Sequence, residues 1–288
     1  MVRSIMNSIS VDLSKRLAAA VDSMPAFPQN VQRIVTLTSN LACSPKELVE
    51  IIGKDPVLTV KVLRVVNSAC YGLSKHVTSI DHAVVFLGFN TIKNLALSVA
   101  AISLLRNNPL AGFDGQRYLL HSLTVASLAR KLAQQLPGAD ANDCFIAGLL
   151  HDFGKVVIAQ FMPDEFRKAM EMSLWHDIAL DQTLHQVVGV DHAAIGAMLT
   201  EKWRFAPDLV DTIRHQHMPA QNDSPMLACV VAANQISRQL GCDLGGGIAA
   251  DPLPTGVAAR LGGKLDTVMA RLGDLGALLE EAQLFATF

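Results

Sequence analysis

Apolar residues recur at helical spacing along almost the whole chain. The segments 120–136, 191–203 and 227–240 each place their apolar side chains on one face of a helix. Gly and Pro fall between such segments, and we find no sustained apolar–polar alternation of the kind that marks a half-buried strand. The pattern therefore predicts an all-α protein with many helices.

Two local signals predict where helices begin in the N-terminal half. Ser44 precedes Pro45 and Glu47, which gives the N-cap, the first-turn proline and the acidic partner of a capping box. Asp55 precedes Pro56, which indicates that another helix begins there. We therefore expect helices that begin at residues 45 and 56.

Composition limits the classes of protein that remain. The chain has 288 residues, half of them hydrophobic, so it can build a large core in one elaborated helical domain or in two. Its net charge is −2, which gives no electrostatic reason for a phosphate backbone to bind. We therefore expect no nucleic-acid partner.

Several features favour a cytoplasmic location. The apolar run Leu95–Leu105 is too short to span a bilayer, and Asp12 and Lys15 interrupt any signal-peptide core. The five cysteines are scattered, without a Cys-x-x-Cys pair, as is typical of buried thiols in a reducing compartment. We expect a cytoplasmic protein without a membrane partner.

The segment Leu149–Lys155 carries an adjacent pair, His151 and Asp152, at the end of an apolar helical run. Imidazole and carboxylate groups from neighbouring residues can reach one divalent ion where a helix bends or ends. The dipeptide alone is a weak signal, because His176-Asp177 repeats it without the following Gly and Lys. We interpret that second pair as surface loop.

Three polar side chains lie on apolar faces of predicted helices. His121, His192 and Asn234 each occupy the apolar stripe of their own segment, where a polar group needs a partner. A single buried histidine usually has a backbone carbonyl as its partner. Three such residues beside His151-Asp152 are explained together by one shared ion, and imidazole is a common metal ligand.

Further groups could serve the same site. His215 and His217 follow the predicted short helix 207–213 and supply more imidazole nitrogen. Lys155 follows Asp152 by three residues and could offset the charge of a phosphate, although it could also be an ordinary solvated lysine at a helix end. The residues thus favour a metal site near a phosphate-binding group.

The order His121, His151-Asp152 and a distal polar residue at 234 resembles the HD-domain metal-dependent phosphohydrolase superfamily. The chain also resembles the HDOD family, the HD-related output domains of bacterial signal transduction, in motifs at residues 24–28, 54–59, 63–69, 83–88 and 189–197. The similarity spans residues 20–240. It implies an HD-domain-like helical bundle with a packed N-terminal helical subdomain.

The resemblance implies four regions, namely an extension at 1–19, an HDOD helical subdomain at 20–112, an HD-like metal-site subdomain at 113–242 and a helical extension at 243–288. The C-terminal extension has an apolar stripe and should pack on the body, with homodimerisation as the alternative. No sensor, receiver or effector domain is visible, so we expect a stand-alone HDOD protein.

The resemblance also implies roles for single residues. The metal ligands that it implies are His121, His151, Asp152, His192, His217 and Asn234. The catalytic positions that it implies are Asp152, which would bridge ions, and Lys155, which would contact phosphate. Iron, manganese, zinc and magnesium are not distinguished by these ligand types.

Three departures leave catalysis open. Asn234 stands where the superfamily has Asp, and Gln216 stands where a His-His pair would begin, with His215 as a substitute for it after a small shift. The Gly-Tyr-Pro extension of the cyclic-di-GMP phosphodiesterases is absent after His217. HDOD proteins mostly lack a full ligand set and act in signalling or scaffolding.

Three functions therefore remain open. The first is a regulatory module that contacts signalling proteins. The second is a metal-dependent phosphohydrolase that acts on a nucleotide or phosphodiester, and the third is a metal or redox sensor. The expected partners are signalling proteins or a small phosphate-containing ligand.

Overall fold

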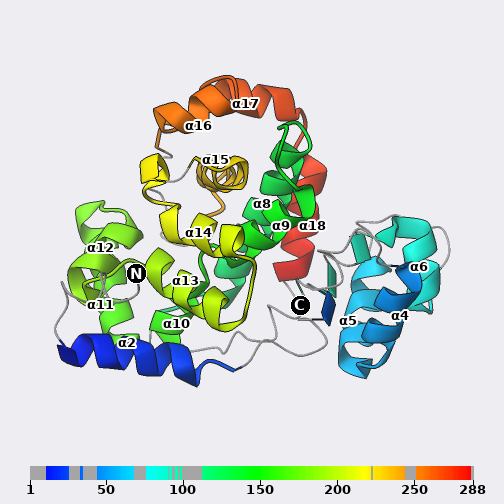
Figure 1. The fold of residues 1–288 in the computed structure, drawn as a ribbon, viewed down its shortest axis with the longest axis horizontal. Coiled ribbons are helices and arrows are strands. Elements are labelled where there is room, and N and C mark those ends of the chain that lie inside the picture. Colours follow the sequence, from blue (N-terminus) through cyan, green and yellow to red (C-terminus); the bar gives the residue numbers. More distant parts are fainter. Residues whose placement is uncertain are drawn as a thin grey trace. The chain divides into compact units, whose positions relative to one another are not determined.

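The computed structural model describes most of the chain, in the ranges 11–25, 33–34, 44–67, 76–89, 91–92, 95–96, 98, 112–221, 223–243 and 251–286. Most of the run Leu95–Leu105, parts of the motifs at 24–28 and 63–69, and the first ten residues lie outside these ranges. Every regular element in the described ranges is helical (Figure 1). The all-α prediction is therefore confirmed.

The chain divides into two compact units, a large one of residues 1–25 and 106–275 and a small one of residues 26–105 and 276–288. The large unit contains α2 (Val11–Ser23), α8 (Gly115–Ala133), α9 (Ala141–Leu150), α10 (Phe153–Phe161), α11 (Pro163–His176), α12 (Leu180–Val188), α13 (His192–Lys202), α14 (Pro207–His215), a 3₁₀ turn (Pro219–Gln221), α15 (Pro225–Gln239), α16 (Thr255–Arg260) and α17 (Leu265–Leu272). The small unit contains α4 (Pro45–Gly53), α5 (Pro56–Val66), α6 (Ile80–Leu87) and α18 (Gly276–Ala286). The finer boundaries that the sequence suggests stay predictions.

Both predicted helix starts of the small unit are present. The Ser44 hydroxyl accepts a hydrogen bond from the Glu47 backbone N–H, and the Glu47 carboxylate accepts one from the Ser44 N–H at 3.0 Å. Asp55 caps α5 by accepting from the Leu58 N–H at 3.0 Å. These bonds satisfy N–H groups that the first turn of a helix leaves without partners.

Helix α8 forms the centre of the large unit, and it packs along α9 and α15. The approach to α9 is close, because a Cβ atom on Gly148 would lie 2.8 Å from the Cα of Ala126. Helices α10 and α13 pack on each other, and α2 covers both (Figure 1). Helices α16 and α17 pack on α15, so the first part of the C-terminal extension joins this unit.

The stretch Ala141–Phe161 is long and apolar enough to cross a membrane by length and composition. It consists of α9, α10 and the turn between them, and 89% of it is buried within the fold. It also carries His151, Asp152 and Lys155. Burial of this extent identifies it as a core segment of the large unit.

Replacement of Gly148 by alanine should destabilise the large unit by about 1–3 kcal/mol, because the new methyl group collides with the backbone of α8. Urea unfolding followed by circular dichroism measures this loss. The matched control is Gly256→Ala on α16, where no atom lies within 4 Å of the added Cβ. An equal unfolding midpoint for Gly148→Ala and the unmodified protein would contradict the close packing.

Candidate metal centre

The turn between α9 and α10 presents the Asp152 carboxylate. Helix α9 ends at Leu150, His151 is its C-cap, and Asp152 is the N-cap of α10 with φ −99° and ψ 6°. An N-cap carboxylate commonly accepts a backbone N–H of its own helix, but Asp152 makes no such capping bond. Its oxygens face side chains from its own helix and from other helices instead.

Three imidazoles and one ammonium surround this carboxylate. Oδ1 of Asp152 lies 2.8 Å from Nε2 of His192 and 3.5 Å from Nε2 of His151. Oδ2 lies 2.6 Å from Nζ of Lys155 and 3.4 Å from Nε2 of His121. All five side chains are buried. Four helices or helix ends thus deliver polar groups to one point.

The other ring nitrogen of two histidines fixes how they face Asp152. Nδ1 of His121 lies 2.6 Å from the Cys242 carbonyl oxygen and 3.1 Å from the Ser237 hydroxyl, and Nδ1 of His151 lies 2.7 Å from the Gly148 carbonyl oxygen. A carbonyl accepts, so each Nδ1 carries the proton and each Nε2 keeps its lone pair toward the cluster. This is the tautomer that a metal ligand requires.

His217 joins the cluster through His192. Their Nε2 atoms lie 3.2 Å apart, and Nδ1 of His217 lies 3.8 Å from Oδ2 of Asp181 on α12. Two facing imidazole nitrogens need a shared proton or an ion between them. The sequence did not single out Asp181, which looks like an ordinary acidic residue in the first turn of a helix.

Charge and burial act in opposite directions on these groups. Burial alone would raise the pKa of Asp152, but the charges of His151, Lys155 and His192 hold that pKa well below its usual range. Burial lowers the pKa of His151 to about 3, and burial beside His192 lowers that of His217 to about 4. His151 and His217 are therefore neutral at physiological pH and able to coordinate.

The remaining predicted residues are placed differently. Gln216 donates from Nε2 to the His151 carbonyl at 2.7 Å, so it braces the backbone of the turn. His215 turns Nδ1 to the Asp211 carbonyl of its own helix at 2.8 Å. The structure thus brings His217 to the cluster rather than His215. The pair His176-Asp177 lies exposed at the end of α11, a helix end where a loop was expected.

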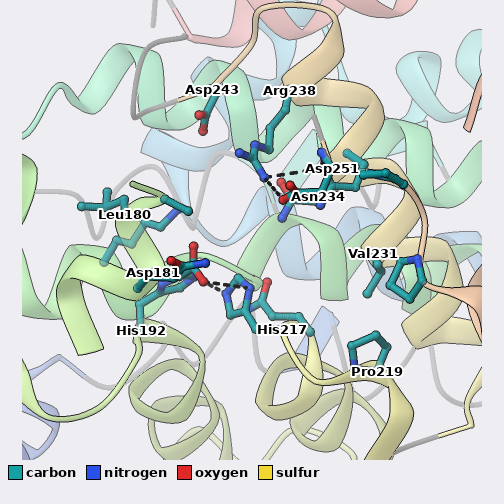
Figure 2. A pocket seen from close by; sticks show the side chains of 17 residues that line it. Leu180, Asp181, His192, His217, Pro219, Val231, Asn234, Arg238, Asp243 and Asp251 are labelled. Carbon is teal, nitrogen blue, oxygen red and sulfur yellow. Dashed lines mark hydrogen bonds and ion pairs between the residues drawn. The ribbon is translucent and has the colours of Figure 1, made fainter. Parts of the chain in front are cut away.

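A cavity of about 240 Å³ adjoins the cluster. His192, His217, Lys155 and Gln216 line one part of it. Figure 2 shows the part that α15 lines, where Asn234 lies near Arg238 and Arg238 reaches Asp251 at 3.2 Å. Other lining residues are Asp181, Gln182, Val231, Gln235 and Asp243. Asn234 therefore faces the cavity beside the cluster, and its role as a ligand stays a prediction.

Close backbone contact brings His192 to Asp152. A Cβ atom on Gly154, in the first turn of α10, would lie 1.9 Å from the His192 carbonyl oxygen and 2.9 Å from the Gly196 backbone nitrogen. Only glycine permits this approach of α10 to the start of α13. Packing therefore explains the glycine of the Gly-Lys that follows the His-Asp pair.

The residues of the cluster fit a divalent metal ion. Ligand atoms of His121, His151 and Asp152 lie within 4.8 Å of one another, and all three side chains are buried. Nε2 of His151, which faces the cluster, is buried without a hydrogen-bond partner in the described residues. Unsatisfied buried nitrogens are costly unless something binds them. Imidazole and carboxylate ligands suit several divalent metals and select none.

The fold and the cluster are those of an HD-type helical protein. The chain belongs to the HDOD domain family, whose model matches residues 24–219. The HDOD resemblance seen in the sequence is thus confirmed over two thirds of the chain.

Three relatives illustrate the similarity. An uncharacterised protein of Treponema pallidum is 29% identical over 240 residues, which is 79% of this chain and 45% of that protein. A provisionally named signal transduction protein of Marinobacter aquaeolei VT8 has a TM-score of 0.77 and 24% identity, with 100% of this chain and 68% of that chain covered. A provisionally named phosphohydrolase of Shewanella amazonensis SB2B has a TM-score of 0.73 and 24% identity, with 94% and 98% covered.

The similarity to the two solved structures is a similarity of fold, because both are below 25% sequence identity. The chain spans less than half the length of the first curated relatives that it matches.

Replacement of Gly154 by alanine should separate α10 from α13 and move His192 away from Asp152. We expect a loss of metal affinity of about tenfold or more together with a stability loss of about 1–3 kcal/mol. Calorimetric titration with Zn²⁺ measures the first effect. The Gly263→Ala variant is the control, since its Cβ would lie 2.8 Å from Cγ2 of Thr267 and would strain the connection between α16 and α17 instead. Equal metal affinity in both variants would contradict a specific role for Gly154.

The metal-free protein should lose stability as pH falls from about 6.5 to about 3. His151 has a folded-state pKa of about 3 and an unfolded value near 6.5, so protons bind the unfolded chain first in this window. The stability contribution is complete above pH 6.5 and declines below it. Urea unfolding in EDTA at several pH values measures the slope.

His151→Asn removes this titration and should flatten the slope, since an amide can still donate to the Gly148 carbonyl. His176→Asn is the control, because it replaces an exposed histidine and leaves the buried imidazole in place. An unchanged slope in His151→Asn would show that another group causes the acid sensitivity.

Proposed function

We propose that this protein is a regulatory HDOD protein of bacterial signal transduction whose large unit binds a divalent metal ion. The observation that carries the proposal is that Nε2 of His151 is buried without a hydrogen-bond partner in the described residues and faces Asp152. Nε2 of His121 faces the same carboxylate. The ion would be held by His121, His151 and Asp152, with His192 and His217 adjoining. Such an ion would supply Lewis-acid character and positive charge beside the cavity.

The ligand set favours regulation over turnover. Asn234 lacks the charge of the aspartate found there in the superfamily, and an amide is a weaker ligand than a carboxylate. Gln216 is committed to the His151 carbonyl by a hydrogen bond of 2.7 Å. The site thus retains metal ligands while the positions that complete a hydrolytic centre are altered. The relative named for signal transduction agrees with this assignment.

A metal-dependent phosphohydrolase is the second candidate. The cavity of about 240 Å³ favours it, because Lys155, His192 and His217 line a space that could hold a small nucleotide or phosphodiester. In that function Asp152 would hold the ion and Lys155 would contact phosphate. The Shewanella relative named as a phosphohydrolase has the same fold.

The proposed setting is the cytoplasm, with signalling proteins as partners. In the regulatory function, the ion would hold the turn after α9 against α8 and α13. It would thereby control the surface that signalling proteins contact. Iron would make that control sensitive to redox state, whereas manganese, zinc or magnesium would make it sensitive to metal supply.

Elemental analysis of the purified protein tests the proposal. We expect about one or two equivalents of a divalent metal in the unmodified protein, and their loss in His151→Ala/Asp152→Ala. The matched control is His176→Ala/Asp177→Asn, which removes the second His-Asp pair; asparagine suits the left-handed backbone there, where φ is 55°. This control should keep its metal.

Hydrolysis assays on the same samples separate the two candidates. A regulatory protein should show no metal-dependent turnover of mononucleotides or cyclic dinucleotides above the level of the double variant. Turnover that depends on both metal and Lys155 would favour the phosphohydrolase. No metal in the unmodified protein, after reconstitution with each of the four metals, would refute metal binding.

A further inference from the structure

Lys155 occupies an unusual place for a lysine. It lies in the first turn of α10, where the helix dipole disfavours a positive charge, and only 7% of its surface is exposed. Its ammonium lies 2.6 Å from Oδ2 of Asp152. A buried cation requires a close counter-ion, and this carboxylate provides it.

The same carboxylate oxygen also faces the candidate metal ligands. Oδ2 of Asp152 lies 3.4 Å from Nε2 of His121, whose lone pair is directed there by the Cys242 carbonyl. An ion held between His121 and this oxygen would share the oxygen with Lys155. Two cations at one buried oxygen repel strongly, because the interior screens charge poorly. Binding of the ion and the Lys155–Asp152 pair thus exclude each other.

The cavity offers a place for the displaced ammonium. Lys155 lines it together with Gln216, His192 and His217. The backbone of α10 is held by the contact of Gly154 with α13, but the four-carbon stem of lysine can turn without moving the helix. The other cation of the cavity wall, Arg238, is engaged by Asp251 at 3.2 Å.

We infer that Lys155 is the resident cation of the metal-free site and that a divalent ion displaces it into the cavity. There its ammonium becomes the binding group for a phosphate-type oxyanion. This inference rests on the proposed function, because the ion must bind at Asp152. It adds a dependence of oxyanion binding on the metal. The oxyanion subsite at Lys155 exists only while metal is bound, so the cavity responds to metal occupancy.

Acylation of lysines in the intact protein tests the displacement. The full chain is treated with N-hydroxysuccinimide acetate in EDTA or with saturating Zn²⁺, and the label on each lysine is measured by peptide mass spectrometry. We expect the labelling rate of Lys155 to rise about tenfold with metal. Lys168, exposed on α11, is the internal control and should not change. Added inorganic phosphate should protect Lys155 only in the metal-bound sample.

Two variants test the competition for Asp152. Lys155→Met removes the competing cation, so its Zn²⁺ affinity should be about tenfold higher than that of the unmodified protein. Lys155→Arg keeps a cation and should stay close to the unmodified affinity. If Lys155→Met does not fold, the acylation of the unmodified protein still decides the question.

The outcomes separate the two proposals. Bound metal with Lys155 still protected, or with unchanged affinity in Lys155→Met, overturns the displacement and leaves the proposed function standing. Metal bound by Lys155→Met alone overturns the displacement, because the ion then does not remove Lys155 from Asp152 in the unmodified protein. No metal in either protein refutes the proposed function and the inference with it.

Discussion

The large unit depends on one buried negative charge. Desolvation of a carboxylate costs several kcal/mol, a large part of the net stability of a domain, unless charges and hydrogen bonds compensate it. Asp152 is compensated by Lys155 and by three imidazoles that come from α8, the end of α9 and the start of α13. The packing of these helices is therefore also the assembly of the site. A change that moves one of them alters the charge balance of the whole cluster.

Much of this arrangement could be predicted from the sequence. The capping residues gave the starts of α4 and α5, and the polar residues on apolar stripes led to His121 and His192 because an apolar face tolerates a polar group only with a partner. Periodicity says which face a residue occupies but carries no information about which helix it meets. The convergence on Asp152 needed the fold, although the resemblance to HD-domain proteins had named His121, His151, Asp152 and His192 as expected metal ligands.

Other features had no signal in the sequence. The carbonyl of Cys242 fixes the tautomer of His121. Every residue has such a carbonyl, so the residue type at 242 does not indicate this contact. The sequence did not single out Asp181 and marked Gln216 only as a departure from a His-His pair. In the structure, Asp181 lies beside His217 and Gln216 braces the turn at His151. The contact of Gly154 with the His192 carbonyl is a steric requirement that the sequence did not indicate. Side chain to backbone contacts across the chain are set by tertiary packing, which local patterns do not encode.

The side chains around Asp152 compensate its charge but leave several polar atoms without hydrogen-bond partners in the described residues, and this combination points to the use of the site. Lys155 and His192 satisfy the carboxylate, but Nε2 of His151, Nδ1 of His192 and Oε1 of Gln216 are buried without hydrogen-bond partners in the described residues. A site that evolved only to stabilise the core would satisfy these atoms or replace them with apolar groups, since each costs about 1–3 kcal/mol. Their retention beside a cavity means that the metal-free state is balanced in charge yet incomplete in bonding. Such a state can exchange an internal cation for an external one, because a cation stays beside the carboxylate while the unsatisfied Nε2 of His151 gains a partner.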